Sequence, residues 1–239
     1  MNRRKALGLF GVMGVEAAAA DKTCCAADHA GAKPGAAMST GPVSSIHSHF
    51  CGIHIAKQDP QFQMIVQHYC GPRGTEMHQC LLYDSLEANA RLLGVEYIIS
   101  DRLYRQLAGR EKAYWHPHTY EVLAGGLIAP EMPPDDEMKF MQGLLTTWGK
   151  TWHTWPDPTT AIPLGEPLLM WALTGDGQED KHVVAARDKQ FGISTANVRA
   201  KRTAAFGLET PQVPPPKSVD EIGRQWTATG DDKPPPREK

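Results

Sequence analysis

The sequence predicts an α+β fold: a single domain with a mostly antiparallel sheet flanked by helices, and disordered N- and C-terminal tails. Two observations carry this prediction. Apolar, β-branched runs alternate with segments of helical periodicity, but without the regular strand–helix–strand spacing of a parallel sheet. The chain of 239 residues has a net charge of −2 with acids and bases interspersed, and its middle part is large enough to bury a core.

The two ends define the expected domain boundaries. Arg3, Arg4 and Lys5 precede a short apolar run and an Ala-x-Ala site before Asp21, which is typical of a secretory signal peptide. The paired arginines also fit twin-arginine export, and an uncleaved disordered segment is the alternative. We therefore expect a periplasmic or otherwise exported protein. The predicted parts are a signal peptide over 1–20, a flexible leader over 21–45, a folded domain over 46–207 and a Pro-rich tail over 208–239.

For the first half of the domain, the sequence predicts strands that alternate with short helices. Ser85 is placed to cap a helix that Gly94 ends, and Ser100 is placed to cap a second helix with Gly109 near its end. The expected strands are 53–55, 78–84 and 95–99.

The second half starts with a strand-like run over 120–129, with Gly125 and Gly126 as a kink. Two prolines followed by three acids at 133–137 are typical of a helix start, because acids favour the positive end of the helix dipole. The remaining expected elements are strands at 151–155 and 168–173 and helices at 181–190 and 195–205, the last with Ser194 as its cap.

The segment 115–122, Trp-His-Pro-His-Thr-Tyr-Glu-Val, holds the most distinctive chemistry of the chain. In an extended chain His116 and His118 project to the same side, and neutral imidazole is the commonest metal ligand in proteins. His153 and His54 lie in strand-like segments with apolar or aromatic neighbours, and are the further ligand candidates. Glu121 is the candidate carboxylate, as a ligand or as an outer acceptor. The cofactor this set predicts is a divalent metal.

A purely structural role for these histidines is the alternative interpretation, since buried imidazoles also pair with backbone groups. In a regular strand Glu121 would lie on the face opposite His116 and His118, and the spacing departs from the cupin pattern. Two function classes stay open. One is a small-ligand or divalent-metal-binding protein with a His-lined pocket. The other is a non-catalytic lipid- or surface-associated protein, and whether the protein is an enzyme is not decided.

Cys70 and Cys80 are the candidate disulfide of the domain. They bracket turn-forming residues, so a hairpin-like closure would bring the two thiols together. In the chain-entropy model so short a loop stabilises the fold by on the order of 2–3 kcal/mol. Two buried thiols, or pairing of a cysteine with His68 or His78, are the alternatives.

Composition limits the partners. No basic stripe occurs, which argues against nucleic acid as a partner. No run of eighteen apolar residues follows the leader, so no transmembrane segment is expected in the mature chain. A small molecule or a lipid remains as the expected partner, and the oligomeric state is not predicted.

Six blocks occur in a fixed order over roughly residues 46–195. They are His68–Cys70, Gln79–Ser85, Ala90–Ile99, Trp115–Val122, Gly149–Trp155 and Pro163–Met170. Together these blocks resemble the oil body-associated protein family. The resemblance implies association with lipid bodies in seeds for the plant members, and it supplies no established activity or catalytic residues. It also implies a family fold that spans nearly the whole domain.

Overall fold

The structure is a computed structural model, and it describes residues 41–208. The expected signal peptide over 1–20 lies outside the described residues, as do most of the leader and the tail from residue 209 onwards. Of the expected leader, the last five residues form a short 3-10 helix, η1 (Gly41–Ser45).

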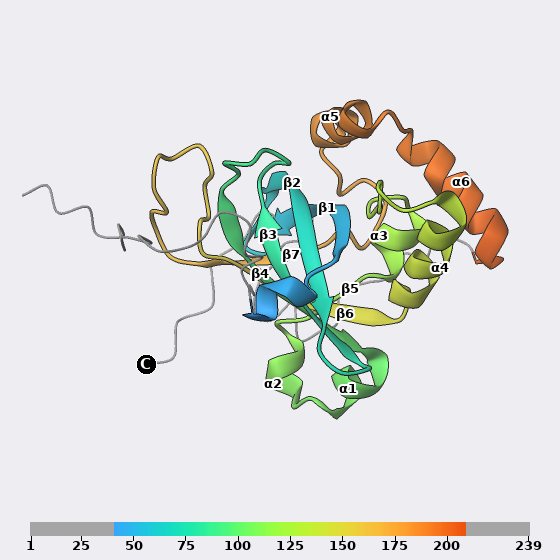
Figure 1. Cartoon of the computed structure of the whole chain (residues 1–239), viewed down its shortest axis with the longest axis horizontal. Coiled ribbons are helices and arrows are strands. Elements are labelled where there is room, and N and C mark those ends of the chain that lie inside the picture. Colours follow the sequence, from blue (N-terminus) through green and yellow to red (C-terminus); the bar gives the residue numbers. More distant parts are fainter. Residues whose placement is uncertain (1–40, 209–239) are drawn as a thin grey trace, which may run out of the picture. The chain divides into compact units, whose positions relative to one another are not determined.

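Six antiparallel strands close into a barrel (Figure 1). The strand order is β4-β3-β2-β1-β7-β6, and β4 pairs with β6 to close the circle. The two-residue strand β5 (His116–Pro117) is added beside β6. The predicted single α+β domain with an antiparallel sheet is confirmed, but the sheet is a closed barrel. The six barrel strands are β1 (Ser48–Ala56), β2 (Asp59–Pro72), β3 (Met77–Tyr83), β4 (Leu92–Ser100), β6 (Thr147–His153) and β7 (Leu168–Trp171).

The α-helices of the described chain lie between β4 and β6 and after β7. The Ser100 and Ser194 side chains accept hydrogen bonds from backbone N–H groups in the first turns of α1 and α6, so both predicted caps are confirmed. Gly109 begins a separate helix, which corrects its expected place near the end of α1. The helices are α1 (Asp101–Gln106), α2 (Gly109–Lys112), α3 (Thr119–Leu123), α4 (Pro134–Leu144), α5 (Lys181–Phe191) and α6 (Thr195–Phe206).

The helix predicted after Ser85 is wrong. The segment forms turns, and the Asp84 carboxylate accepts hydrogen bonds from the backbone N–H of Arg91 at 2.8 Å and from its guanidinium at 3.0 Å. These two bonds close a loop across the residues that the sequence assigned to a helix. Strand β4 therefore starts earlier than predicted, at Leu92.

The strand predicted over 120–129 is also wrong. This segment begins as α3 and turns back at Gly125, whose φ of +77° is a left-handed conformation that favours glycine. The backbone N–H groups of Gly126 and Leu127 both donate to the Glu121 carbonyl, which ends the helix in a tight turn. The chain thus contributes a helix where an additional strand was expected.

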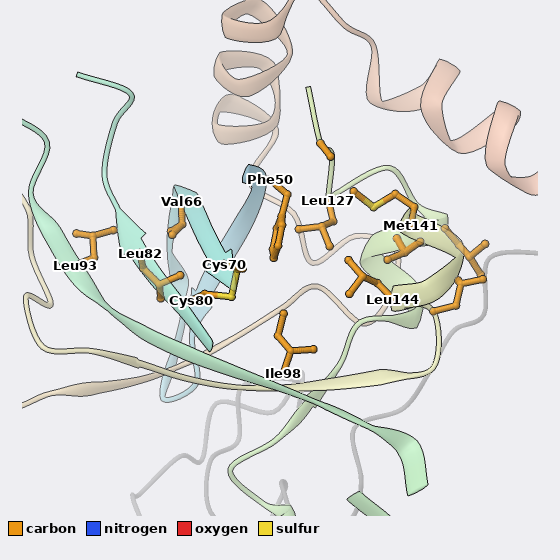
Figure 2. Packing of buried hydrophobic residues seen from close by; sticks show 14 residues of the cluster. Phe50, Val66, Cys70, Cys80, Leu82, Leu93, Ile98, Leu127, Met141 and Leu144 are labelled. Atoms are coloured by element: carbon orange, nitrogen blue, oxygen red, sulfur yellow. A yellow bond between two sulfur atoms is a disulfide. The ribbon is translucent and has the colours of Figure 1, made fainter. Parts of the chain in front are cut away.

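The hydrophobic core lies between strands of the barrel and the α3–α4 region (Figure 2). Cys70 of β2 and Cys80 of β3 are cross-strand neighbours with Cα atoms 4.1 Å apart, and they form a disulfide within this core. Cys51 is the free cysteine of the described residues, and burial raises the pKa of its thiol to about 12. The core around the disulfide includes Phe50, Val66, Leu82, Ile98, Leu127, Met141 and Leu144.

Candidate metal centre

Five histidines and two glutamates meet in the interior of the domain. Each is at most 4 % exposed, so their polar atoms are largely withdrawn from water and depend on protein groups or a bound ion as partners. They come from six different elements that are far apart in sequence. The residues are His54 of β1, His68 of β2, Glu96 of β4, His116 of β5, His118 and Glu121 at the start of α3, and His153 of β6.

Glu96 points inward because of the strand alternation of β4. Its neighbour Tyr97 is 41 % exposed on the outside of the barrel, whereas Glu96 is 2 % exposed. Across the sheet, Glu96 pairs with Thr151 of β6 and with Cys80 of β3. A carboxyl group is thereby placed in the barrel interior.

The Glu96 carboxylate is the centre of the cluster. Its Oε1 lies 3.4 Å from Nε2 of His116 and 3.4 Å from Nε2 of His118. Ligand atoms about 2.0–2.1 Å from one tetrahedral ion are about 3.3–3.4 Å apart, which is the spacing seen here. Its other oxygen, Oε2, lies 3.1 Å from Nε2 of His68.

The tautomer of His118 follows from its hydrogen bonds. Its Nδ1 lies 2.7 Å from the Thr147 hydroxyl, and that hydroxyl donates its one hydrogen to the Leu144 carbonyl at 2.7 Å. The hydroxyl oxygen must therefore accept from Nδ1–H of His118. In a neutral imidazole Nε2 then carries a lone pair, and this lone pair faces the carboxylate of Glu96.

His68 is fixed in the same way. Its Nδ1 lies 3.2 Å from the Val66 carbonyl, which can only accept a hydrogen bond, so Nδ1 carries the hydrogen. Its Nε2 lone pair faces Oε2 of Glu96, and its ring stacks on Phe50. The Nε2 atoms of two imidazoles therefore converge on one carboxylate, an arrangement that a proton or a metal ion between nitrogen and oxygen would stabilise.

Gly149 of β6 gives the cluster its space. A Cβ atom at this position would lie 2.1 Å from Oε1 of Glu96, and 2.7 Å from Nε2 of both His116 and His118. The first value falls within the range of metal–ligand distances, about 2.0–2.2 Å, and the other two are longer. The absence of a side chain at 149 thus leaves space beside the three ligand atoms.

The pKa values of the two glutamates are shifted in opposite directions. Burial raises the pKa of Glu96, but the imidazoles of His116, His118 and His68 outweigh it and hold that pKa well below its usual value. Burial and the nearby charge of Glu96 raise the pKa of Glu121 well above its usual value. Glu96 is therefore the ionised carboxylate, and Glu121 is a buried acid beside it.

His54 and His153 extend the cluster away from Glu96. His54 lies 2.9 Å from His68 through its Nε2, and 3.0 Å from Nε2 of His153 through its Nδ1. Burial lowers the pKa of His153 to about 3 and that of His54 well below its usual value. Both imidazoles are therefore neutral, which is the form that binds metals.

Two buried arginines hold α3 in place. The Arg187 guanidinium of α5 donates to the carbonyls of Gly125 and Gly126 at 2.9 and 2.8 Å. Arg202 of α6 donates to the carbonyls of Val122 and Leu127, and forms an ion pair with Glu137 of α4. These bonds fix the turn after α3, and so the position of the segment that carries His118 and Glu121.

The structure brings all five metal candidates of the sequence into one cluster, but with different neighbours. Among the described residues, two groups place their ligand atoms within 4.8 Å of one another. The first is Glu96, His116 and His118, and the second is His54, His68 and Glu96. His153 and Glu121 lie beside these groups. The carboxylate in both is Glu96, which is not among the ligands predicted from the sequence.

His116 and His118 do not share a strand face, which corrects the expected geometry. His116 is in β5, whereas His118 has a helical backbone (φ −87°, ψ −8°) and precedes α3. His118 donates its backbone N–H to Thr147, and His116 pairs with Gly149. Both residues are therefore aligned along β6, which brings their Nε2 atoms to the same oxygen of Glu96.

An apolar groove on the outside of the barrel is separate from the cluster. It has a volume of about 260 Å³ and lies over β3 and β4 beside η1. Tyr97 lines it, whereas its sequence neighbour Glu96 points to the interior. Its apolar lining includes Val43, Ile46, Leu81, Val95 and Tyr97.

Comparison with known proteins shows relatives over most of the domain. Residues 40–205 match a family described as a protein of unknown function, DUF1264. The chain is 38 % identical over 175 residues to oil body-associated protein 1B of Arabidopsis thaliana, covering 73 % of each chain. It is 37 % identical over 169 residues to oil body-associated protein 1A of Zea mays, covering 70 % of this chain and 71 % of the relative.

Fold and site together define an α+β barrel protein with a buried histidine–glutamate cluster in its interior. Within that class, the chain belongs to the oil body-associated protein family, as the resemblance of the six blocks predicted. No solved structure matches the chain significantly. Within residues 41–208, none of the helices has the length and apolar character needed to cross a bilayer.

Proposed function

We propose that the protein binds a divalent metal ion through Glu96, His116 and His118. The convergence of imidazole nitrogens on the Glu96 carboxylate is the observation that carries the proposal. His118 is held with its Nε2 lone pair toward Oε1, and all three ligand atoms surround the space beside Gly149. A cation in that space would satisfy the buried polar atoms together.

The ligand set restricts the ion. Two imidazoles and one carboxylate suit Zn²⁺, Fe²⁺ or Mn²⁺, whereas Ca²⁺ and Mg²⁺ prefer sites built from oxygen alone. Three protein ligands also leave further coordination positions open, as in catalytic rather than closed structural sites. Glu121 lies next to one of them, since its Oε1 is 3.8 Å from Nε2 of His118.

Removing a ligand is expected to abolish metal binding. Elemental mass spectrometry of protein purified without an affinity tag should show at least one equivalent of a transition metal. The variant Glu96→Gln should contain less than about a tenth of that, and His118→Ala should lose the equivalent held by Glu96, His116 and His118, because loss of one of three ligands weakens a site severely.

His49→Ala provides the matched control for this experiment. His49 is also a buried histidine of β1, but its Nε2 pairs with Gln67 at 3.0 Å and it lies outside both ligand groups. The control should keep its metal even where its stability falls. A metal-free wild-type protein, or equal metal content in all variants, would contradict the proposal.

We also propose that the mature protein is exported and begins near Asp21. The basic residues and Ala-x-Ala site of the leader motivate this, and the Cys70–Cys80 disulfide supports it because disulfides persist in oxidising compartments. N-terminal sequencing of protein from its native host should start close to residue 21. Recovery of a chain that retains residues 1–20 would exclude cleavage at this site.

A further inference from the structure

The second ligand group shares Glu96 with the first. Nε2 of His68 lies 2.9 Å from Nε2 of His54 and 3.1 Å from Oε2 of Glu96. Ligand atoms about 2.1 Å from one octahedral ion are about 3.0 Å apart, which fits both distances. This group uses the carboxylate oxygen that faces away from His116 and His118.

We propose that Glu96 bridges two divalent cations, and that His54 and His68 hold the second of them. This inference rests on the proposed function, because the bridge requires the first ion on Oε1. The second ion would lie on Oε2. A carboxylate that binds one ion through each oxygen holds them about 3.5–4 Å apart, the separation typical of two-metal centres.

His153 completes the second site from outside. A metal on Nε2 of His54 requires the hydrogen of that ring on Nδ1, and Nδ1 lies 3.0 Å from Nε2 of His153. His153 would accept this hydrogen bond and orient the His54 ring, as second ligand shells do for metal-bound histidines. His153 is therefore a positioning residue, and its fully buried ring has no direct place on either ion.

Charge also favours a second acid near two ions. Two divalent cations beside one carboxylate would leave a large uncompensated charge in the interior. Oε1 of Glu121 lies 3.8 Å from the same Nε2 of His118 that faces Glu96, so Glu121 supplies a second buried carboxyl group, whose ionised form nearby cations would favour. The pair of acids makes the centre suited to more than one ion.

Counting equivalents of Mn²⁺ tests the bridge. Full-length protein stripped of metal and titrated with Mn²⁺ should bind two equivalents, and its electron paramagnetic resonance signal should show spin coupling. His54→Ala and His116→Ala should each bind one equivalent without coupling, Glu96→Gln should bind neither tightly, and His49→Ala should bind two. Circular dichroism of each variant checks that the fold is retained.

The outcomes separate this inference from the proposed function. One equivalent that is lost in His116→Ala but kept in His54→Ala overturns the second site and leaves the first intact. One equivalent that depends on His54 but not on His116 overturns both. Two uncoupled equivalents would overturn the bridge, because the ions would then not share Glu96.

Discussion

Replacing Gly149 with alanine is expected to lower the affinity for a divalent metal by more than about 100-fold without unfolding the barrel. The new methyl group would occupy the space between Glu96, His116 and His118, since its carbon would lie 2.1–2.7 Å from their ligand atoms. The φ of Gly149 is negative, so alanine fits the backbone. The displaced atoms are ends of side chains, so we expect a stability cost of about 1–3 kcal/mol.

Titration of the stripped protein with Zn²⁺ measures this effect, and thermal unfolding without metal measures the stability. Gly143→Ala is the matched control, because Gly143 lies in α4 with no atom within 4 Å of its added Cβ. That variant should bind Zn²⁺ like the wild type and be equally or slightly more stable. Unchanged affinity in Gly149→Ala would show that no ion sits between the three ligands.

Replacing Gly94 with alanine is expected to prevent stable folding. A Cβ atom there would lie 1.9 Å from the backbone carbonyl oxygen of Trp152 and 2.9 Å from Cα of His153. These are backbone atoms of β6, so relief of the clash requires β4 and β6 to separate. Because that pairing closes the barrel, we expect a loss of on the order of 3 kcal/mol or more.

The midpoint of urea unfolding, compared between Gly94→Ala and Gly143→Ala, measures this loss. Soluble Gly94→Ala protein with a wild-type midpoint would contradict the close approach of the two strands. The contrast with Gly149 is informative, since both glycines belong to the β4–β6 pair. Gly94 leaves room for the neighbouring backbone of β6, and Gly149 leaves room for the ligand atoms.

The sequence predicted the fold class because local signals were strong. Serine caps at 100 and 194 and the proline–acid helix start at 133–137 are short-range features, and the helices α1, α4 and α6 follow them. Closure of the barrel depends instead on the pairing of β4 with β6, which are about 50 residues apart. No local pattern encodes that contact.

Glu96 was missed because the strand pattern around it is inverted. Val95 and Tyr97 are the apolar residues of this stretch, so periodicity places them inside and the glutamate outside. In the structure Tyr97 is 41 % exposed and Glu96 is 2 % exposed. The available signal was that Glu96 is a single acid within an apolar, β-branched run. Such an acid can mark a polar site, because an interior that holds an ion needs polar side chains on the buried face.

His68 and His118 were obscured by different effects. His68 lies in β2, whose glutamines hide the alternation of a strand, and its place two residues before Cys70 suggested a cysteine partner instead. His118 was assigned to a strand, but its segment turns into α3. The prediction that His116 and His118 share a strand face was therefore wrong. That the two residues bind one metal ion stays a prediction.

Burial of the cluster has a consequence for how quickly an ion is exchanged. Every proposed ligand is at most 3 % exposed, and the ligands lie on barrel strands or on the β5–α3 segment beside β6. An ion bound there would leave only when the barrel or this segment opens, so its removal by a chelator would proceed at the opening rate, whatever the chelator concentration. Occupancy would then reflect which metal was abundant while the chain folded, and the equilibrium order of affinities would matter little.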